Sequence, residues 1–269
     1  MNIKSKIKSM SNISASTMST MKMACAGKFN GGVFALFSGY LLKIIYLLPM
    51  IFLWRSFAES GADLGGFTLS RLLTYTCVSA KLSEQLNVWT DASSWNYDGH
   101  LINLYMRPQS IFGQIIFRTV GGWMPELLMF SLPLAVILPF FGVDIIPATA
   151  WFLPCLILSV SLGFAVDTLF VCLSIRMKNT EWQITCFRRA ISAVLSGAVI
   201  PFDLLPFGMG GVFRLLPFGS MASAPLTLFV GTAEPFNIIL FQVIWNIVLW
   251  PAAILIFSKS RERIVSYGG

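Results

Sequence analysis

Six charged residues lie inside long apolar stretches of the sequence, where they are the side chains best placed to do chemistry. They are Lys43, Arg71, Lys81, Glu84, Glu126 and Asp167. A charge within a bilayer is costly, so it usually pairs with another charge or faces water. Arg71 and Glu84 fall near the ends of their stretch and can reach the interface. The others are consistent with a polar substrate path or proton relay, or with an ion pair of Lys81 with Glu126 or Asp167 that fixes helix packing.

Motifs for enzymatic chemistry are missing from the sequence. No G-x-x-x-x-G-K-[ST] segment is present to cradle ATP phosphates, and neither H-E-x-x-H nor G-x-S-x-G occurs. His100 is the single histidine, and the five cysteines have no C-x-x-C spacing. We therefore expect no catalytic residue, no metal site and no cofactor in this chain.

The composition indicates what kind of protein must position these charges. Of the 269 residues, 56% are hydrophobic and 12% are charged, whereas a typical soluble domain has about 25% charged residues. This composition excludes a water-soluble globular domain, a disordered chain and a small disulfide-rich secreted module. The fold class expected is an all-α integral membrane protein.

Runs of about 20 mostly apolar residues predict six membrane-spanning helices. Their approximate bounds are 33–54, 67–88, 119–143, 147–175, 190–205 and 235–257. The second run is the weakest, because it carries three of the six charges. Without it, the basic residues of 259–263 would lie outside the cell, against the rule that cytoplasmic loops are rich in Lys and Arg.

The distribution of basic residues predicts the orientation. With the N-terminus inside and six spans, fourteen Lys and Arg residues fall on the cytoplasmic side and two on the outer side. We therefore expect a multi-pass protein of the cell membrane with both termini cytoplasmic. The net charge of +7 follows from this topology and does not indicate nucleic-acid binding.

The polar N-terminal segment, residues 1–32, precedes the membrane-spanning region 33–269. Apolar residues recur in it at helical spacings of three and four, with lysines between them. This pattern favours an amphipathic helix on the inner membrane surface. A disordered leader is the alternative.

Residues 90–108, between the second and third predicted spans, predict a short amphipathic helix on the cytoplasmic side. Leu101, Leu104 and Tyr105 form a short apolar face, and Arg107-Pro108 ends the segment because a residue before proline disfavours helix. Such a helix can dock into a groove of another protein. A plain interfacial loop is the alternative.

Residues 198–232 are apolar but are broken by prolines and glycines. Irregular backbone at membrane depth is tolerated only where it packs in protein or lines a cavity. We therefore expect two short helices that dip into the membrane from the outer side before the last span. The alternative is one kinked span followed by a long surface loop.

Two motifs in these segments resemble the membrane subunits of ABC exporters of the type-2 class, the six-span ABC-2 family transporter proteins related to daunorubicin- and viologen-type exporters. The first motif reads Gly99, Leu101, Leu104, Arg107 and Pro108. The second reads Gly197, Pro201, Pro206, Leu216, Pro217, Phe218, Pro225 and Gly231. The resemblance covers the chain from about residue 33 to its C-terminus.

The resemblance implies a permease without its own ATPase. In such systems two permease subunits, identical or related, form the translocation path, and a separate ATPase subunit docks on the cytoplasmic side. The first motif would then be the coupling element received by the ATPase, and the second would close the exterior. An amphipathic drug, peptide or lipid-like compound would be moved out of the cytoplasm.

Two other classes of function remain open from the residues alone. A secondary transporter or channel would use Glu126 and Asp167 as its proton- or ion-coupled groups. A non-transporting membrane scaffold or immunity protein would bind a partner without turnover. Dependence of transport on a partner ATPase would distinguish an ABC permease from both of these classes.

Overall fold

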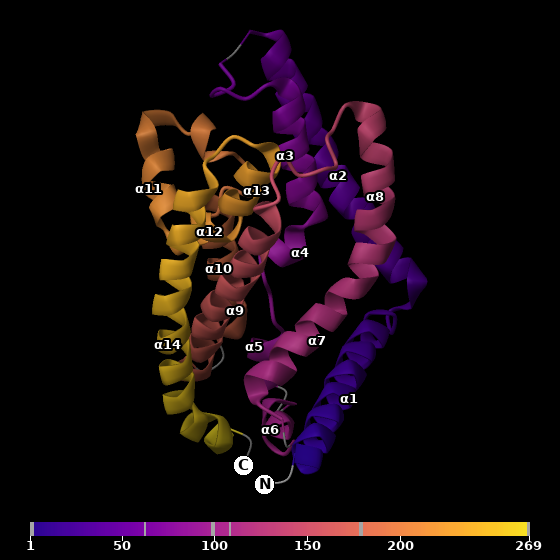
Figure 1. Cartoon of the computed structure of the whole chain (residues 1–269), viewed down its shortest axis with the longest axis vertical. Coiled ribbons are helices and arrows are strands. Elements are labelled where there is room, and N and C mark those ends of the chain that lie inside the picture. The colour runs from indigo at the N-terminus through magenta and orange to yellow at the C-terminus, as the bar shows by residue number, and fades with distance from the viewer. Residues whose placement is uncertain (1–2, 62, 98–99, 108, 178–179, 268–269) are drawn as a thin grey trace.

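The computed structural model describes residues 3–61, 63–97, 100–107, 109–177 and 180–267, and every regular element in these ranges is helical (Figure 1). The N-terminal half contains α1 (Ile3–Lys28), α2 (Gly32–Glu59), α3 (Leu69–Lys81), α4 (Ser83–Leu86), α5 (Ala92–Tyr97), α6 (His100–Tyr105) and α7 (Ile111–Glu126). The C-terminal half contains α8 (Leu132–Ile137), α9 (Phe152–Arg176), α10 (Glu181–Leu195), α11 (Met209–Leu215), α12 (Pro217–Met221), α13 (Ser223–Val230) and α14 (Pro235–Tyr267). The all-helical fold class is thus confirmed.

Four helical segments are long and apolar enough to cross a membrane. They are Leu36–Glu59, Ile111–Phe141, Phe152–Arg176 and Pro235–Ser260. They correspond to the first, third, fourth and sixth runs predicted from the sequence. The apolar side chains of Leu36–Glu59 and Pro235–Ser260 are largely exposed, as lipid-facing side chains are, whereas half of Phe152–Arg176 is buried inside the protein.

The other two predicted runs fold differently from expectation. The run 67–88 forms α3, of 13 residues, and the single turn α4, and eight consecutive residues of α3 are buried in protein. The run 190–205 has the wrong bounds, because α10 begins at Glu181 and ends at Leu195. The buried Tyr75 and Ser79 hydroxyls of α3 donate to protein carbonyls, so hydropathy alone does not mark the ends of this helix.

The third long segment is bent in its middle. Ser110 caps the start of α7 by accepting a hydrogen bond from the Gly113 backbone N–H at 3.2 Å. Pro125 lies inside the helix, and a π-helical turn, Leu127–Ser131, separates α7 from α8. Proline removes a backbone donor, and a π turn commonly marks a functional position in a helix. Glu126, one of the predicted intramembrane charges, immediately precedes this turn.

Helix α9 is the centre of the bundle. It packs along α14 and also contacts α4, α5, α10, α12 and α13. Figure 1 shows α5, α6 and the ends of α1 and α14 at one end of the molecule, with α11 to α13 toward the other. The segments predicted to couple and to gate therefore lie at opposite ends of the same central helix.

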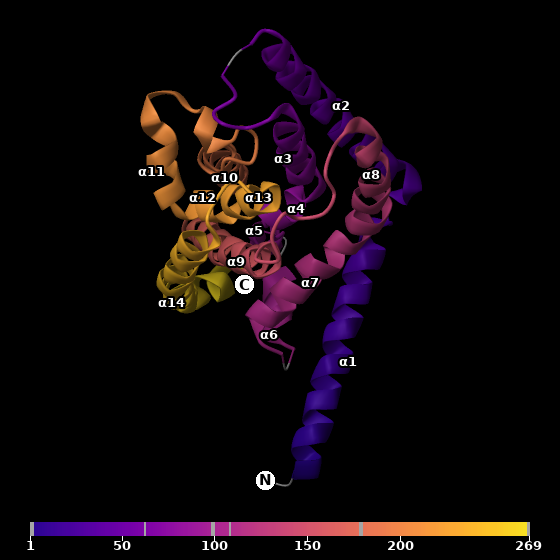
Figure 2. The same cartoon turned by 45° about the horizontal axis from the view of Figure 1, so that its top comes forward.

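Helix α1 runs beside α7 and extends beyond the rest of the bundle (Figure 2). The two backbones approach closely at Gly121, where an added Cβ would lie 2.7 Å from the Met21 Cα. The helical character expected for the N-terminal segment is present.

Candidate coupling and gating sites

Glu126 of the bent segment forms an ion pair with α2. Its Oε1 lies 2.6 Å from the Lys43 Nζ, and Lys43 is also 3.5 Å from the Glu84 Oε1 of α4. The Glu126 side chain is buried, whereas Lys43 and Glu84 are half-buried. The predicted pairing of Glu126 with Lys81 is wrong, because Lys43 lies nearer along the packed α2 face.

Asp167 of α9 pairs with a different residue, Arg188 of α10. Both side chains are almost fully buried, with 3% and 2% exposed surface. The Thr90 hydroxyl donates to the same carboxylate, and the Arg188 guanidinium also donates to the Val88 carbonyl. The Trp89 ring centroid lies 4.8 Å from the guanidinium carbon, within cation–π range. The predicted Lys81–Asp167 pair is also wrong.

This second cluster joins three separate parts of the chain. Asp167 belongs to α9, Arg188 to α10, and Val88 to Thr90 form the link between α4 and α5. A buried ion pair of this kind holds its elements in one arrangement, since breaking it leaves an uncompensated charge. Movement of the α5–α6 segment is thereby connected to two helices of the bundle.

The remaining two intramembrane charges lie apart from these clusters. Arg71 is exposed near the start of α3. Lys81, at the end of α3, is half-buried, and its ammonium takes part in none of the ion pairs found among the described residues. The carbonyl of Lys81 accepts a hydrogen bond from the Ser131 hydroxyl at 2.7 Å, which ties α3 to the π turn.

The predicted coupling segment forms α5 and α6. Leu104 is 5% exposed and packs in a core cluster with Trp95, Ile111, Ile175 and Phe257. Its side chain therefore stabilises this chain's own core and offers no docking surface, contrary to expectation. Gly99, Pro108 and the side chain of Leu101 lie outside the described residues.

The outward surface of this segment is made by its polar and flexible side chains. Met106 is 76% exposed, and Arg107 beside it is exposed as well. The guanidinium carbon of Arg118, on α7, lies 4.3 Å from the Trp95 ring centroid and holds α5 against α7. Met106 and Arg107 are therefore exposed side chains at the end of α6.

At the opposite end, α3 holds the chain that follows α10. The Tyr75 hydroxyl donates to the Gly197 carbonyl and the Ser79 hydroxyl to the Ala198 carbonyl, each at 2.6 Å. Gly197 has a φ of 70°, which a residue with a side chain adopts only with strain. A Cβ added there would lie 2.9 Å from the Phe202 ring, so Gly197 also admits this buried phenyl group.

The segment after Gly197 forms three short α-helices, α11 to α13, instead of two. Pro201 precedes one 3₁₀ turn and Pro206 begins a second. Pro217 begins α12, Pro225 lies in the first turn of α13, and Gly231 ends α13 with a φ of 74°. Leu216 caps the start of α12, and Phe218 packs against the buried Met221. Trp245 of α14 donates to the Leu215 carbonyl at 3.0 Å, which anchors α11 to the last long helix.

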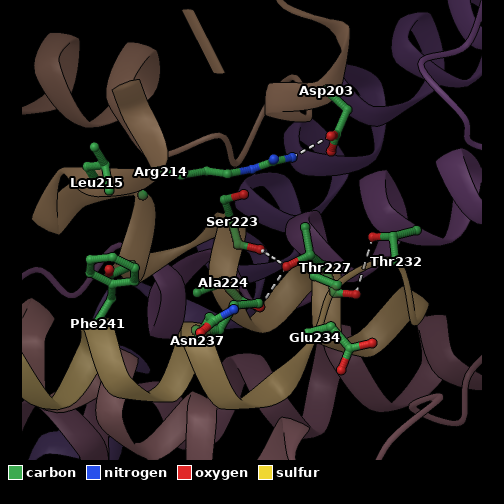
Figure 3. Close-up of a pocket in the computed structure, with 14 residues that line it drawn as sticks. Asp203, Arg214, Leu215, Ser223, Ala224, Thr227, Thr232, Glu234, Asn237 and Phe241 are labelled. Carbon is green, nitrogen blue, oxygen red and sulfur yellow. Dashed lines mark hydrogen bonds and ion pairs between the residues drawn. The ribbon is translucent and has the colours of Figure 1, made fainter. Parts of the chain in front are cut away.

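A cavity of about 410 Å³ with both apolar and polar lining lies among α11, α12, α13 and α14 (Figure 3). It is lined by Asp203, Arg214, Ser223, Thr227, Glu234 and Asn237, among others. Asp203 and Arg214 form an ion pair across it, and the Thr227 hydroxyl is turned toward its own helix, where it donates to the Ser223 carbonyl. The cavity can hold water or a polar group at the end remote from α5 and α6.

Sequence reasoning missed Arg188 and Thr90. With a fifth span expected to begin at residue 190, Arg188 falls in a predicted cytoplasmic loop, yet Ile184, Arg188 and Ser192 recur at intervals of four and share the buried face of α10. This four-residue spacing is the sequence signal that places Arg188 on the buried face of a helix. In the part of the chain that the structure describes, no group of three or more His, Cys, Asp or Glu side chains could hold a metal ion.

A family model described as ABC-2 family transporter protein matches residues 44–268 of the chain. The matched region includes the α5–α6 segment, the Asp167–Arg188 pair and the helices α11 to α13. Among the curated proteins compared with the chain, none matches it.

Proposed function

The chain belongs to the ABC-2 family of transporter membrane proteins, and from this premise we propose that it is the permease subunit of an ATP-driven export system. Membrane subunits of this family are typically non-catalytic, and the sequence has no phosphate-binding loop of its own. ATP hydrolysis is therefore supplied by a separate ATPase subunit. A second permease subunit, identical or related, completes the translocation path, and an amphipathic compound is moved out of the cytoplasm.

The observation that carries this proposal is the link between the α5–α6 segment and the bundle. Residues 88–90 are bound to the buried Asp167–Arg188 pair, and α6 is packed through Leu104 against α7, α9 and α14. A force applied by the ATPase at Met106 and Arg107 is transmitted through these contacts to long helices. The residues Gly99, Leu101, Leu104, Arg107 and Pro108 act together as the coupling segment, with Leu104 as its internal anchor.

We further propose six crossings with both termini on the cytoplasmic side. The four long apolar segments supply four crossings, the buried α3 with α4 supplies a fifth, and α10 supplies the sixth. The basic residues of the two terminal segments, Lys4 to Lys28 and Lys259 to Arg263, then share one side of the membrane, which supports this topology. Residues 1–32 then form an interfacial segment and residues 33–269 the permease domain.

Helices α11 to α13 serve as the outer gate in this proposal. Gly197, Pro201, Pro206, Leu216, Pro217, Phe218, Pro225 and Gly231 set the bends of the gate. The contacts from α3 and from Trp245 hold the gate to helices on both sides of it. A relative movement of α3 and α14 would therefore open or close the outer end.

The alternative of a gradient-driven transporter has less support. It requires Glu126 and Asp167 to exchange protons or ions, yet both carboxylates are already engaged by Lys43 and Arg188. These pairs favour a structural role for the two acidic residues.

Replacing Met106 with aspartate is expected to weaken ATPase association by about tenfold or more, because it puts a charge into the centre of the docking contact while leaving the core unchanged. The measurement is co-purification of the ATPase, identified by its Walker A motif, with the tagged chain. Met209→Asp is the matched control, since Met209 is also exposed but lies on α11 at the other end. Equal ATPase recovery with both variants would reject the coupling surface, and a wild-type chain that purifies without any ATPase would reject the exporter.

A further inference from the structure

A second large cavity lies between α1, α6 and α7, at the end of the molecule that holds the coupling segment. Its volume is about 460 Å³. Residues from all three helices line it, together with the chain on either side of them, and those used here are Lys28, Asp91, Arg107, Gln114, Arg118 and Gly122. The cavity exists because α1 packs beside α7, and it is separate from the ion pairs described above.

The lining of this cavity is strongly basic. Lys28, Arg107 and Arg118 face a single carboxylate, that of Asp91. None of these four side chains takes part in an ion pair within the ranges that the structure describes. A concave surface with an excess of one charge concentrates ions of the opposite sign. Arginine in particular matches the geometry of phosphate oxygens.

One buried polar atom in the lining has no partner. Gln114 is 2% exposed, and its amide nitrogen donates to the carbonyls of Leu104, at 3.0 Å, and Gln109, at 3.1 Å. Its amide oxygen is buried and has no hydrogen-bond partner. Because a buried acceptor is costly to leave unsatisfied, a ligand here would gain if its hydroxyl group donated a hydrogen bond to this oxygen.

The cavity also lies beside the chain that leads into the first long apolar segment. Lys28 ends α1, and the first long apolar segment begins at Leu36. A Cβ added at Gly122 would lie 3.4 Å from the Lys28 Cε, so the lysine stem runs along α7 beside the cavity. Basic pockets between helices at this level of a membrane suit anionic headgroups.

We propose that this cavity binds an anionic phosphodiester that also carries a hydroxyl group, with Lys28, Arg107 and Arg118 around the phosphate and the Gln114 amide oxygen accepting from the hydroxyl. A phosphatidylglycerol headgroup and free glycerophosphoglycerol both present this chemistry. Since α6 forms one wall, the bound anion connects the N-terminal helix to the coupling segment.

Lys28→Gln is the test of the cationic part. We expect it to reduce the affinity for phosphatidylglycerol by about fivefold, which is the contribution of one cation to the binding of an anionic headgroup. Lys28→Arg should retain the wild-type affinity. Lys22→Gln removes a lysine from the same helix outside the cavity and is the matched control. The full chain is placed in phosphatidylcholine nanodiscs with increasing phosphatidylglycerol, and bound lipid is counted by native mass spectrometry. Equal losses from Lys28→Gln and Lys22→Gln would overturn the site.

Two further ligands complete the test. One lacks the hydroxyl group but keeps the charge, and the other carries the same headgroup without the lipid tails. Phosphatidylmethanol has the same charge without the hydroxyl, and we expect it to bind about threefold to tenfold more weakly, the range for one hydrogen bond. Equal binding would overturn the role of Gln114. Saturable binding of glycerophosphoglycerol in solution would assign the site to a free phosphate ester, and binding of the lipid alone would assign it to the membrane. Absence of both would reject the proposal.

Discussion

Replacing Asp167 with asparagine is expected to lower the free energy of unfolding by about 3–5 kcal/mol, because it leaves the Arg188 guanidinium buried without a counter-charge. The same change weakens the hold of residues 88–90 on α9, since the asparagine side chain offers Thr90 and Arg188 one neutral oxygen in place of two charged ones. We therefore also expect ATP hydrolysis by the complex to continue with little transport. The measurements are denaturant unfolding in mixed micelles and transport into proteoliposomes.

The Asp203–Arg214 pair provides the matched control for this substitution. It joins the same two residue types, but 49% of the Arg214 side chain and 30% of the Asp203 side chain are exposed. Asp203→Asn should therefore cost about 1 kcal/mol or less. The double variant Asp167→Asn with Arg188→Gln should recover part of the loss, because the buried charge is removed with its partner. Additive losses from the two substitutions would show that the residues are not coupled.

Replacing Gly210 with alanine is expected to destabilise the outer gate by about 1–3 kcal/mol, the usual cost of an added methyl group in a filled site. The new Cβ would meet the carbonyl oxygen of Phe202, which is backbone and cannot turn away. Phe202 is 2% exposed and fixes the bend between α10 and α11. The displaced gate should raise the passive leak of proteoliposomes to small polar solutes and lower the melting temperature.

Gly211 is the neighbouring control on the same helix. A Cβ added at Gly211 has open space around it. Gly211→Ala should be neutral or stabilise α11 by up to about 1 kcal/mol, because alanine favours helix over glycine. If Gly210→Ala and Gly211→Ala have the same melting temperature and the same leak, the tight packing around Phe202 does not hold the gate.

The long apolar helices could be predicted from the sequence because contact with lipid depends only on whether the side chains are apolar. A side chain in contact with lipid must be apolar whatever the neighbouring helices are, so residues 33–54 and 235–257 indicate spans directly. The same reasoning fails for α3, which is buried in protein. Tyr75 and Ser79 lower its hydropathy, yet their hydroxyls are bonded to the carbonyls of Gly197 and Ala198. Partners of this kind are visible only in the folded chain.

The candidate sites could be predicted only in part, again because the partners of each residue are visible only in the folded chain. The sequence identifies which charges lie in apolar stretches, and Glu126 and Asp167 are indeed in ion pairs. It does not determine their partners, because pairing depends on how α2, α9 and α10 rotate about their axes. The apolar face containing Leu104 was recognised correctly, but periodicity does not distinguish a face that meets a partner from one that meets the chain's own core.

The buried pair between α9 and α10 also sets a condition on how the protein is made. Asp167 precedes Arg188 by 21 residues, and ribosomes add about 5–20 residues each second. The nascent α9 therefore carries its carboxylate for about one to four seconds before the matching guanidinium has been synthesised. During that interval α9 must remain beside the insertion machinery or in contact with water, so the two helices are expected to enter the membrane as a pair.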